Sequence, residues 1–264
     1  MYKKTVWQAG EYRIIKKSHS YRYPGGKRGR REKRTPEAME RENRKRRRDS
    51  LQLLILANFK KGDLWITLPY SREQRPESIA EAKDRFRRFV RKLGAICKKR
   101  GQEIKWIVTT ERGSRGGCHH HLIINSIPGI TELIAELWQY AKKVINEHLY
   151  EDGQFESLAE YIIKSETKED GSGTYYSRSR NLIVPEPKTE IVGAKTFYDE
   201  PKAVKGYELL KDSITNGTNP FTGYPYQRYI MKKVRQKTGR EEKGSVERGN
   251  HMEKAGPGIR QRSV

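Results

Sequence analysis

The sequence has little of several features that mark common classes of protein. It has only two cysteines, Cys97 and Cys118, and neither belongs to a CxxC pair. A disulfide framework and a cysteine-rich zinc finger are therefore not expected, and the cysteine usage fits a reducing compartment. No G-x-x-x-x-G-K-[ST] string occurs, so the sequence contains no P-loop motor motif.

Long apolar runs are also missing from the sequence. None reaches the roughly 18 residues that a transmembrane helix needs. The opening residues, MYKKTVWQAGEY, lack the apolar core of a signal peptide. Together these absences predict a soluble, cytoplasmic protein.

Acidic side chains are scarce relative to basic ones. The chain has 33 Asp and Glu residues against 56 Lys and Arg residues, which gives a net charge of +23. Such an excess needs a polyanionic partner or a strongly solvated surface. Nucleic acid is the commonest partner, because neutralising its phosphates releases condensed counterions. An anionic membrane surface is the other candidate.

The N-terminal part of the chain is expected to be basic and elongated. Residues 1–34 are interpreted as an extended or irregular basic arm. A helix is predicted over 35–58, with Thr35 as its N-cap and Pro36 at its first position. The basic run RENRKRRR in this helix is either a solvated face or a surface for DNA phosphates. Its candidate DNA contacts are Arg46, Arg47 and Arg48.

Residues 59–233 are predicted to form the main domain, and residues 234–264 a disordered basic tail, because the tail has almost no large apolar side chains. The domain's fold class is α+β, and the β-α-β-β-α order predicts a ferredoxin-like (RRM-like) antiparallel sheet with helices packed on it. Two more strands are expected around the turn TNGTNPFTGYP. The predicted elements are a strand at 64–70, a helix at 76–100, strands at 103–111 and 118–126, and a helix at 128–150.

Three consecutive histidines, half of those in the chain, lie in the second predicted hairpin strand. Side chains alternate along a strand, so His119 and His121 share one face and His120 takes the other. A turn centred near residue 115 places Glu111 opposite His119. Two imidazoles and one carboxylate then converge, which is a donor set for a catalytic divalent metal. The plainer alternative is that the histidines are structural.

A candidate nucleophile lies further along the chain, in the short predicted helix LAEYIIK. Tyr161 and Lys164 are three positions apart, so they lie on one helix face. A tyrosine hydroxyl attacks phosphorus usefully only beside a cation, with the phosphate polarised by a metal. On its own, the Y-x-x-K spacing is weak, because a tyrosine on an amphipathic helix usually packs in the core.

Taken in order, these motifs resemble those of HUH endonucleases, and in particular the rolling-circle replication initiators of bacterial plasmids, phages and integrative elements. Four stretches within residues 50–232 carry the resemblance: NFKKGDLWITLPY, ERGSRGGCHHHLIIN, LAEYIIK and YYSRSRNLIVPEP. The family's middle position between the two histidines is normally hydrophobic, whereas here it is His120. The resemblance implies an HUH endonuclease fold.

The resemblance also implies roles for individual residues. Glu111, His119 and His121 become ligands of Mg²⁺ or Mn²⁺. Tyr161 becomes the nucleophile that forms a 5′-phosphotyrosine link, and Lys164 the cation that assists it. The residues expected to contact DNA phosphates and unpaired bases are Tyr175, Tyr176, Arg178, Arg180 and Asn181.

The expected function is therefore nicking and rejoining of one strand at a replication origin. The expected partners are single-stranded or hairpin origin DNA, with a host helicase and polymerase. A single-strand transposase or a conjugative relaxase would use the same chemistry. A basic DNA-binding protein without catalysis, whose histidines are structural, is the alternative from another class.

Overall fold

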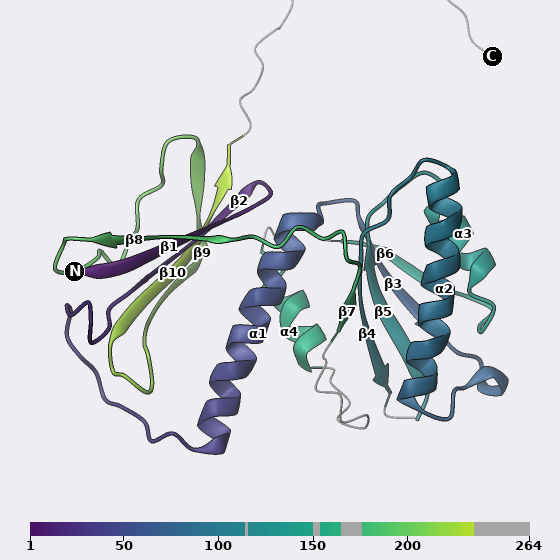
Figure 1. Cartoon of the computed structure of the whole chain (residues 1–264), viewed down its shortest axis with the longest axis horizontal. Helices are drawn as coiled ribbons and strands as arrows, with labels where there is room; N and C mark the ends of the chain where they lie inside the picture. Colours follow the sequence, from purple (N-terminus) through teal and green to yellow (C-terminus); the bar gives the residue numbers. More distant parts are fainter. Residues whose placement is uncertain (114–115, 150–153, 165–175, 235–264) are drawn as a thin grey trace, which may run out of the picture. The chain divides into compact units, whose positions relative to one another are not determined.

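The computed structural model describes residues 1–113, 116–149, 154–164 and 176–234, which have a mixed α+β fold with two five-stranded antiparallel sheets (Figure 1). Within these ranges, no helix is both long enough and apolar enough to span a membrane. The helices are α1 (Pro36–Asn58), a short 3-10 turn (Arg72–Gln74), α2 (Ile79–Lys99), α3 (Ile130–Leu137) and α4 (Glu156–Lys164).

The first sheet, which we name the histidine sheet, has the strand order β6-β3-β5-β4-β7. Its first four strands follow the ferredoxin-like connection β3-α2-β4-β5-α3-β6, of which the sequence predicts the part from β3 to α3. Strand β7 adds a short edge beside β4. The strands are β3 (Leu64–Pro69), β4 (Trp106–Arg112), β5 (Cys118–Ile124), β6 (Ile145–His148) and β7 (Ser177–Arg178).

Both faces of the histidine sheet are covered, so its central strand β5 is buried along most of its length. On one face, Leu122 and Ile124 belong to a core formed with α2 and α3. On the other face, Ile123 belongs to a core that includes side chains of α1 and α4. Alternation along one strand thus sends His120 into the first core and leaves His119 and His121 on the face of α4.

The helix predicted over 128–150 is wrong in its second half, because α3 ends at Leu137. The next residue, Trp138, is almost completely buried, and its indole N–H donates to the Pro69 carbonyl oxygen at 2.7 Å. Residues 145–148 then pair with β3 as strand β6. Pairing with the free edge of β3 therefore determines the structure of residues 145–148, although their local sequence pattern favours a helix. Periodicity within the sequence does not reveal such a tertiary contact.

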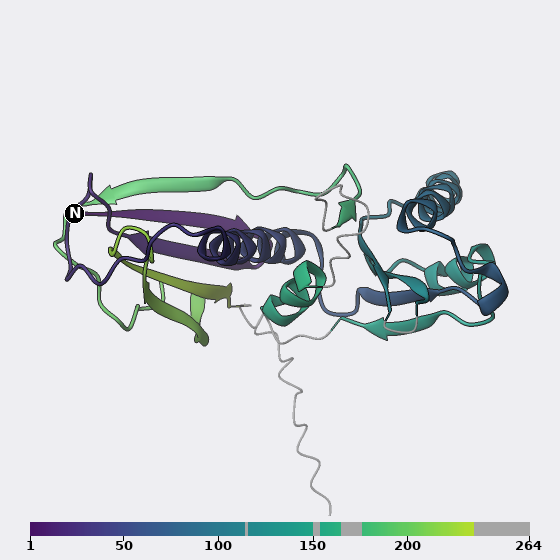
Figure 2. The same cartoon turned by 90° about the horizontal axis from the view of Figure 1, so that it is seen from below.

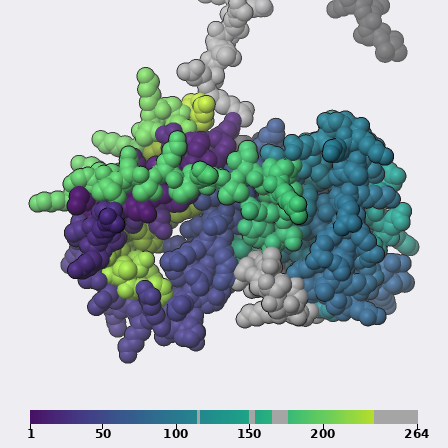
Figure 3. Space-filling view, in the orientation of Figure 1, coloured from purple at the N-terminus to yellow at the C-terminus, as the bar shows by residue number. Residues whose placement is uncertain are grey.

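The second sheet, which we name the terminal sheet, joins segments from both ends of the described chain in the order β8-β1-β2-β10-β9. In Figure 3 the N-terminal atoms, in purple, lie against yellow-green atoms of the later segment. The two strands expected around the turn TNGTNPFTGYP are confirmed as β9 and β10. The strands are β1 (Tyr2–Ala9), β2 (Tyr12–Ser18), β8 (Pro187–Val192), β9 (Tyr207–Thr218) and β10 (Pro225–Lys233).

The extended or irregular arm expected at residues 1–34 is extended over most of its first half, where it forms a β-hairpin. Ala9 pairs with Tyr12, which leaves a two-residue turn that begins with Gly10 at φ +59°. Type II′ hairpin turns favour glycine at this position. A Cβ on Gly10 would also come within 2.8 Å of the Leu56 carbonyl oxygen of α1. The predicted disordered tail falls outside the described residues except for Val234.

Helix α1 begins as the sequence predicts, since the Thr35 hydroxyl accepts a hydrogen bond from the Ala38 N–H. Its second half is apolar and packs against β1 and β2 of the terminal sheet and against α4, as the view in Figure 2 also shows for the strands. Burying each large aliphatic side chain stabilises such a core by about 1.5–3 kcal/mol. The buried aliphatic residues of α1 are Leu51, Leu54, Ile55 and Leu56.

Candidate metal and nucleophile site

The β4–β5 hairpin has the register that the sequence predicts. Glu111 pairs with His119, and Thr109 pairs with His121. The Glu111 Oε1 atom lies 2.6 Å from His119 Nε2 and 2.8 Å from His121 Nε2. The ligand atoms of these three residues lie within 4.8 Å of one another. One carboxylate oxygen and two imidazole nitrogens therefore face a common point on one side of the sheet.

Helix α4 brings Tyr161 to the same point. The Tyr161 hydroxyl donates to Glu111 Oε1 at 3.0 Å, and it also lies 3.0 Å from His121 Nε2. The helix buries Ile162 and Ile163 in the core, so Tyr161 and Lys164 remain exposed on its other side. The amphipathic spacing of LAEYIIK thus places a tyrosine hydroxyl directly beside the candidate metal ligands.

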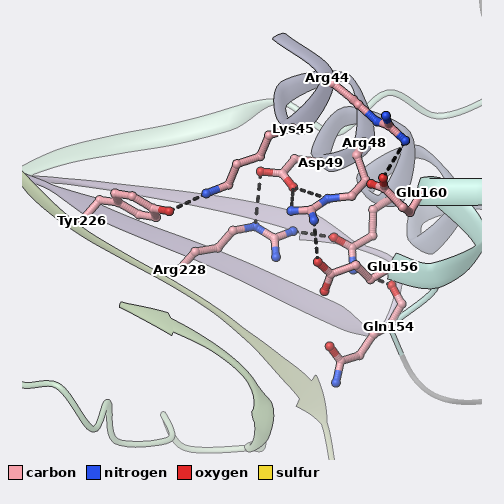
Figure 4. A network of polar contacts seen from close by, with 10 residues as sticks. Arg44, Lys45, Arg48, Asp49, Gln154, Glu156, Glu160, Tyr226 and Arg228 are labelled. Atoms are coloured by element: carbon pink, nitrogen blue, oxygen red, sulfur yellow. Dashed lines mark hydrogen bonds and ion pairs between the residues drawn. The ribbon is translucent and has the colours of Figure 1, made fainter. Parts of the chain in front are cut away.

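Ion pairs to α1 hold α4 in this position (Figure 4). Arg48 pairs with Glu156 at 2.9 Å, and Arg44 pairs with Glu160 at 3.0 Å. Glu160 immediately precedes Tyr161 in the sequence. The Arg48 side chain is 20% exposed and that of Glu156 is 41% exposed, so the pair is shielded from solvent mainly on the arginine side.

Strand β3 contributes two residues that sequence reasoning did not identify. The Thr67 hydroxyl lies 3.1 Å from His121 Nδ1, and the Trp65 ring stacks on the His121 ring with centroids 5.0 Å apart. Thr67 fixes the orientation of the imidazole, and Trp65 fixes its plane. The strand alternation puts Trp65 and Thr67 on one face, but only the observed pairing of β3 with β5 brings that face to His121.

The middle histidine, His120, belongs to the opposite core, as its position in the strand predicts. Its Nε2 lies 2.9 Å from the Tyr70 hydroxyl and its Nδ1 lies 2.8 Å from the Thr110 hydroxyl. Burial lowers the pKa of His120 to about 3, and His119 and His121 contribute to this shift. His120 is thus a neutral, hydrogen-bonded core residue.

The electrostatics of the site centre on Glu111. Burial acts to raise the pKa of Glu111, but hydrogen bonds from His119 and His121 outweigh it and hold this pKa well below its usual range. Burial, together with the hydrogen bond to Glu111 and the charge of that carboxylate, raises the pKa of Tyr161 to about 12. The ionised carboxylate therefore disfavours a phenolate at this position in the absence of an added positive charge.

The chemistry of the donor set fits a divalent cation. Nε2 of both histidines and Oε1 of Glu111 converge, and these are ligand types of a catalytic site with open coordination positions. When His121 binds a metal through Nε2, its Nδ1 carries the proton and donates to the Thr67 hydroxyl. Such a hydrogen bond from the other ring nitrogen is a regular feature of metal-bound histidines.

The arginines proposed as DNA contacts on α1 all have acidic neighbours. Arg46 pairs with Glu42 at 3.4 Å and keeps a side chain that is 66% exposed. Arg47 pairs with Glu40 at 3.0 Å. Arg48 contacts Asp49 as well as α4, so much of its hydrogen-bonding capacity is engaged within the protein.

The second group of proposed DNA contacts follows α4 in the sequence. Arg178 and Arg180 are exposed, whereas Tyr176 is half-buried and packs against the core shared with α4. The Asn181 amide donates to the Glu103 carboxylate and to the Ile104 carbonyl oxygen, each at 2.9 Å, so it also anchors the chain. Tyr175 lies outside the described residues.

Comparison with known proteins gives one finding for this region. A family model whose description names the replication-associated protein ORF2 matches residues 63–170. The matched segment contains Glu111, His119, His121 and Tyr161. No curated protein and no solved structure gives a significant match. The family match supports a role as a replication initiator.

Proposed function

We propose that this protein is a replication initiator of the HUH endonuclease type, which nicks one DNA strand at an origin through Tyr161 and later rejoins it. The observation that carries this proposal is the position of the Tyr161 hydroxyl, 3.0 Å from Glu111 Oε1 and 3.0 Å from His121 Nε2. A tyrosine that only packed a core would have no reason to place its hydroxyl against two of the three potential metal ligands. The similarity to replication-associated proteins over residues 63–170 supports the same proposal.

The proposed reaction is a transfer of the DNA phosphate to tyrosine. The Tyr161 oxygen gives up its proton and attacks the phosphorus, the bond from phosphorus to the 3′ oxygen breaks, and a 5′-phosphotyrosine link forms. The leaving 3′ oxygen takes up a proton and becomes the free 3′-hydroxyl. A divalent cation held by Glu111, His119 and His121 would act as a Lewis acid on the scissile phosphate. Attack of a 3′-hydroxyl on the link reverses these steps and rejoins a strand.

The chain's own residues supply the rest of the arrangement. Glu111 Oε1 holds the proton of Tyr161 through a hydrogen bond before the reaction. Lys164, one turn along the exposed face of α4, contributes positive charge near the phosphate. Trp65 and Thr67 keep the His121 ring in one orientation. Holding the reacting groups in place lowers the entropic part of the barrier.

The identity of the metal is part of the proposal. Two imidazole ligands suit Mn²⁺ somewhat better than Mg²⁺, whereas Mg²⁺ is more available in cells. The proposed partners are single-stranded or hairpin origin DNA, with a host helicase and polymerase that extend the free 3′ end. Arg178, Arg180 and Tyr176 are proposed to contact this DNA.

The deciding experiment is covalent trapping on DNA. Wild-type protein is incubated with Mn²⁺ and labelled single-stranded DNA from the region flanking its own gene, and adducts are separated under denaturing conditions. We expect an adduct with the wild type, none with Tyr161→Phe, and a normal amount with the control Tyr198→Phe, which changes an exposed tyrosine outside the site. A wild-type protein that binds this DNA tightly without forming an adduct would instead be a non-catalytic DNA-binding protein. A transposase or relaxase would form the same adduct on a different DNA sequence.

A further inference from the structure

A pocket of about 210 Å³ lies between α1 and the terminal sheet, and none of the metal-site residues lines it. Its walls come from α1, from β2 and the residues after it, and from β10 and the loop before it. Four of its lining side chains are cationic and two are acidic. They are Lys16, Lys45, Arg46 and Arg228, with Glu42 and Asp49.

The acidic groups of the pocket are already engaged with arginines. Glu42 pairs with Arg46 at 3.4 Å. Asp49 accepts from Arg48 at 2.8 Å and lies 3.9 Å from Arg228. Figure 4 shows Asp49 between these two guanidinium groups. Each carboxylate of the pocket therefore has an arginine, and not a lysine, as its ion-pair partner.

The two lysines approach the same aromatic ring. The Lys16 Nζ lies 5.7 Å and the Lys45 Nζ 4.6 Å from the centre of the Tyr226 ring. Lys45 also donates to the Tyr226 hydroxyl. Neither lysine forms an ion pair within the part of the chain that the structure describes. Burial lowers the pKa of Lys16; Asp49 and Glu42 oppose this shift, whereas Lys45 and Arg46 add to it.

A buried imidazole in the pocket wall lacks a hydrogen-bond partner on one side. His19 is 4% exposed, and its Nδ1 donates to the Met1 carbonyl oxygen at 2.9 Å. Its Nε2 has no partner among the described residues. In the neutral ring this atom is an acceptor for an N–H or O–H group. Buried polar atoms are normally satisfied, so this acceptor is available to a donor group of a bound molecule.

We propose that this pocket binds one nucleotide of the DNA strand, with its phosphate at Lys16 and Lys45. A nucleotide offers both complements of the pocket: anionic oxygens for the ammonium groups, and an N–H of the base for His19 Nε2. The assignment to DNA rests on the proposed function, which brings a DNA strand to the protein. A free phosphate or mononucleotide carries the same chemistry and is distinguished by experiment.

The first experiment measures DNA binding without catalysis. Fluorescence anisotropy with a labelled single-stranded 12-mer is recorded in EDTA over a range of salt concentrations. The double variant Lys16→Gln/Lys45→Gln is compared with Lys92→Gln/Lys98→Gln, which removes two exposed lysines from α2. We expect the pocket variant to raise the Kd about tenfold more than the control. Its slope of log K against log[salt] should fall in magnitude by about 0.7, the value for one phosphate on a single strand.

Equal losses in the two double variants would overturn the proposal, because they would reflect net charge alone. Ser18→Asp provides an independent variant, which adds a carboxylate to the pocket and removes no cation. It should weaken binding as the lysine variant does, while thermal melting reports that both remain folded. Calorimetry with inorganic phosphate and with dTMP tests the source of the phosphate. Binding of either as tight as that of the 12-mer would overturn the assignment to DNA.

The two proposals fail in different experiments. Without an adduct in the trapping experiment, nicking through Tyr161 is wrong, but a pocket-specific loss of affinity in EDTA would still support the nucleotide site. With a normal adduct and equal losses in the two double variants, the nucleotide site alone is wrong.

Discussion

Two threonines, on the strands that flank β5, contact different histidines of that strand. Thr67 on β3 lies 3.1 Å from Nδ1 of His121, on the side of Glu111 and Tyr161. Thr110 on β4 lies 2.8 Å from Nδ1 of His120, inside the opposite core. Both contacts join a threonine to an imidazole, but only the first one orients a candidate metal ligand. Changing Thr67 should therefore affect metal binding, whereas changing Thr110 should affect only the stability of the fold.

The first prediction concerns these two threonines. Thr67→Val keeps the shape of the side chain and removes the hydroxyl that orients His121. We expect it to weaken Mn²⁺ binding about tenfold or more, the usual effect of removing a partner of a metal-bound histidine. Calorimetric titration with MnCl₂ measures this affinity.

Thr110→Val is the matched control for that experiment. It leaves the buried Nδ1 of His120 without a partner, so it should lower the free energy of unfolding by about 1–3 kcal/mol and leave the Mn²⁺ affinity unchanged. A variant pair with the opposite pattern would mean that His120, rather than His121, binds the metal.

At the scale of elements, helix α4 depends on α1 for its position. The candidate nucleophile is on α4, whereas the candidate metal ligands are on β4 and β5. Ion pairs of Arg44 and Arg48 with Glu160 and Glu156 connect α4 to α1, as Figure 4 shows. Asp49 extends this network to Arg228 of the terminal sheet. A change in α1 is therefore expected to alter where the tyrosine lies without altering the metal ligands.

The second prediction follows from this division. Arg48→Gln removes the partly buried pair with Glu156 and should lower the free energy of unfolding by about 2 kcal/mol, between the values for exposed and buried pairs. It should slow formation of the DNA adduct about tenfold while the Mn²⁺ affinity stays the same. Single-turnover trapping and metal titration measure the two quantities.

Arg41→Gln is the control on the same helix. Arg41 pairs with Glu32 and its side chain is 67% exposed, so its removal should cost at most about 1 kcal/mol. The adduct should form at nearly the wild-type rate. If Arg48→Gln also left the rate unchanged, α4 would not depend on this ion pair for its position.

At the scale of the whole molecule, the terminal sheet joins the first strands of the chain to the last strands that the structure describes. Strand β2 lies between β1 and β10, so hydrogen bonds connect the first residues of the chain to residues 225–233. Ala9 and Ile14 of this hairpin are buried in the core that also contains side chains of α1 and α4. Residues 2–18 are therefore part of the fold and not an appendage to it.

The third prediction tests this role of the N-terminal hairpin. Deleting residues 1–18 removes two strands from the middle of the terminal sheet and exposes the apolar side of α1. We expect the truncated protein to lose its cooperative thermal transition or to aggregate, as measured by circular dichroism and light scattering. Deleting residues 235–264 is the control, and its melting temperature should match that of the full chain. An arm that serves only DNA binding would leave both truncations equally stable.

The fourth prediction concerns the charge of the whole chain. With a net charge of +23, binding to a single strand is expected to neutralise about six phosphates, so log K should fall with log[salt] at a slope near −4. Anisotropy titrations between low and physiological salt measure this slope. A flat dependence would mean that the positive charge serves a partner other than DNA.

Several features follow from the sequence alone, because they depend on local spacing. Alternation along a strand separates His120 from His119 and His121, and a turn centred near residue 115 sets Glu111 opposite His119. Helical spacing puts Tyr161 and Lys164 on one exposed face. These rules act over a few residues, so the candidate ligands, the candidate nucleophile and the ferredoxin-like order are predictable.

Other features were decided only by tertiary structure, because they depend on contacts between distant segments. Strand β6 replaces the predicted second half of a helix, since β3 has a free edge to pair. The pairing of β2 with β10 converts an expected arm into the centre of a sheet. Thr67 reaches His121 through the register of β3 with β5. Local pattern determines which side chains share a face, whereas long-range pairing and packing determine what that face meets.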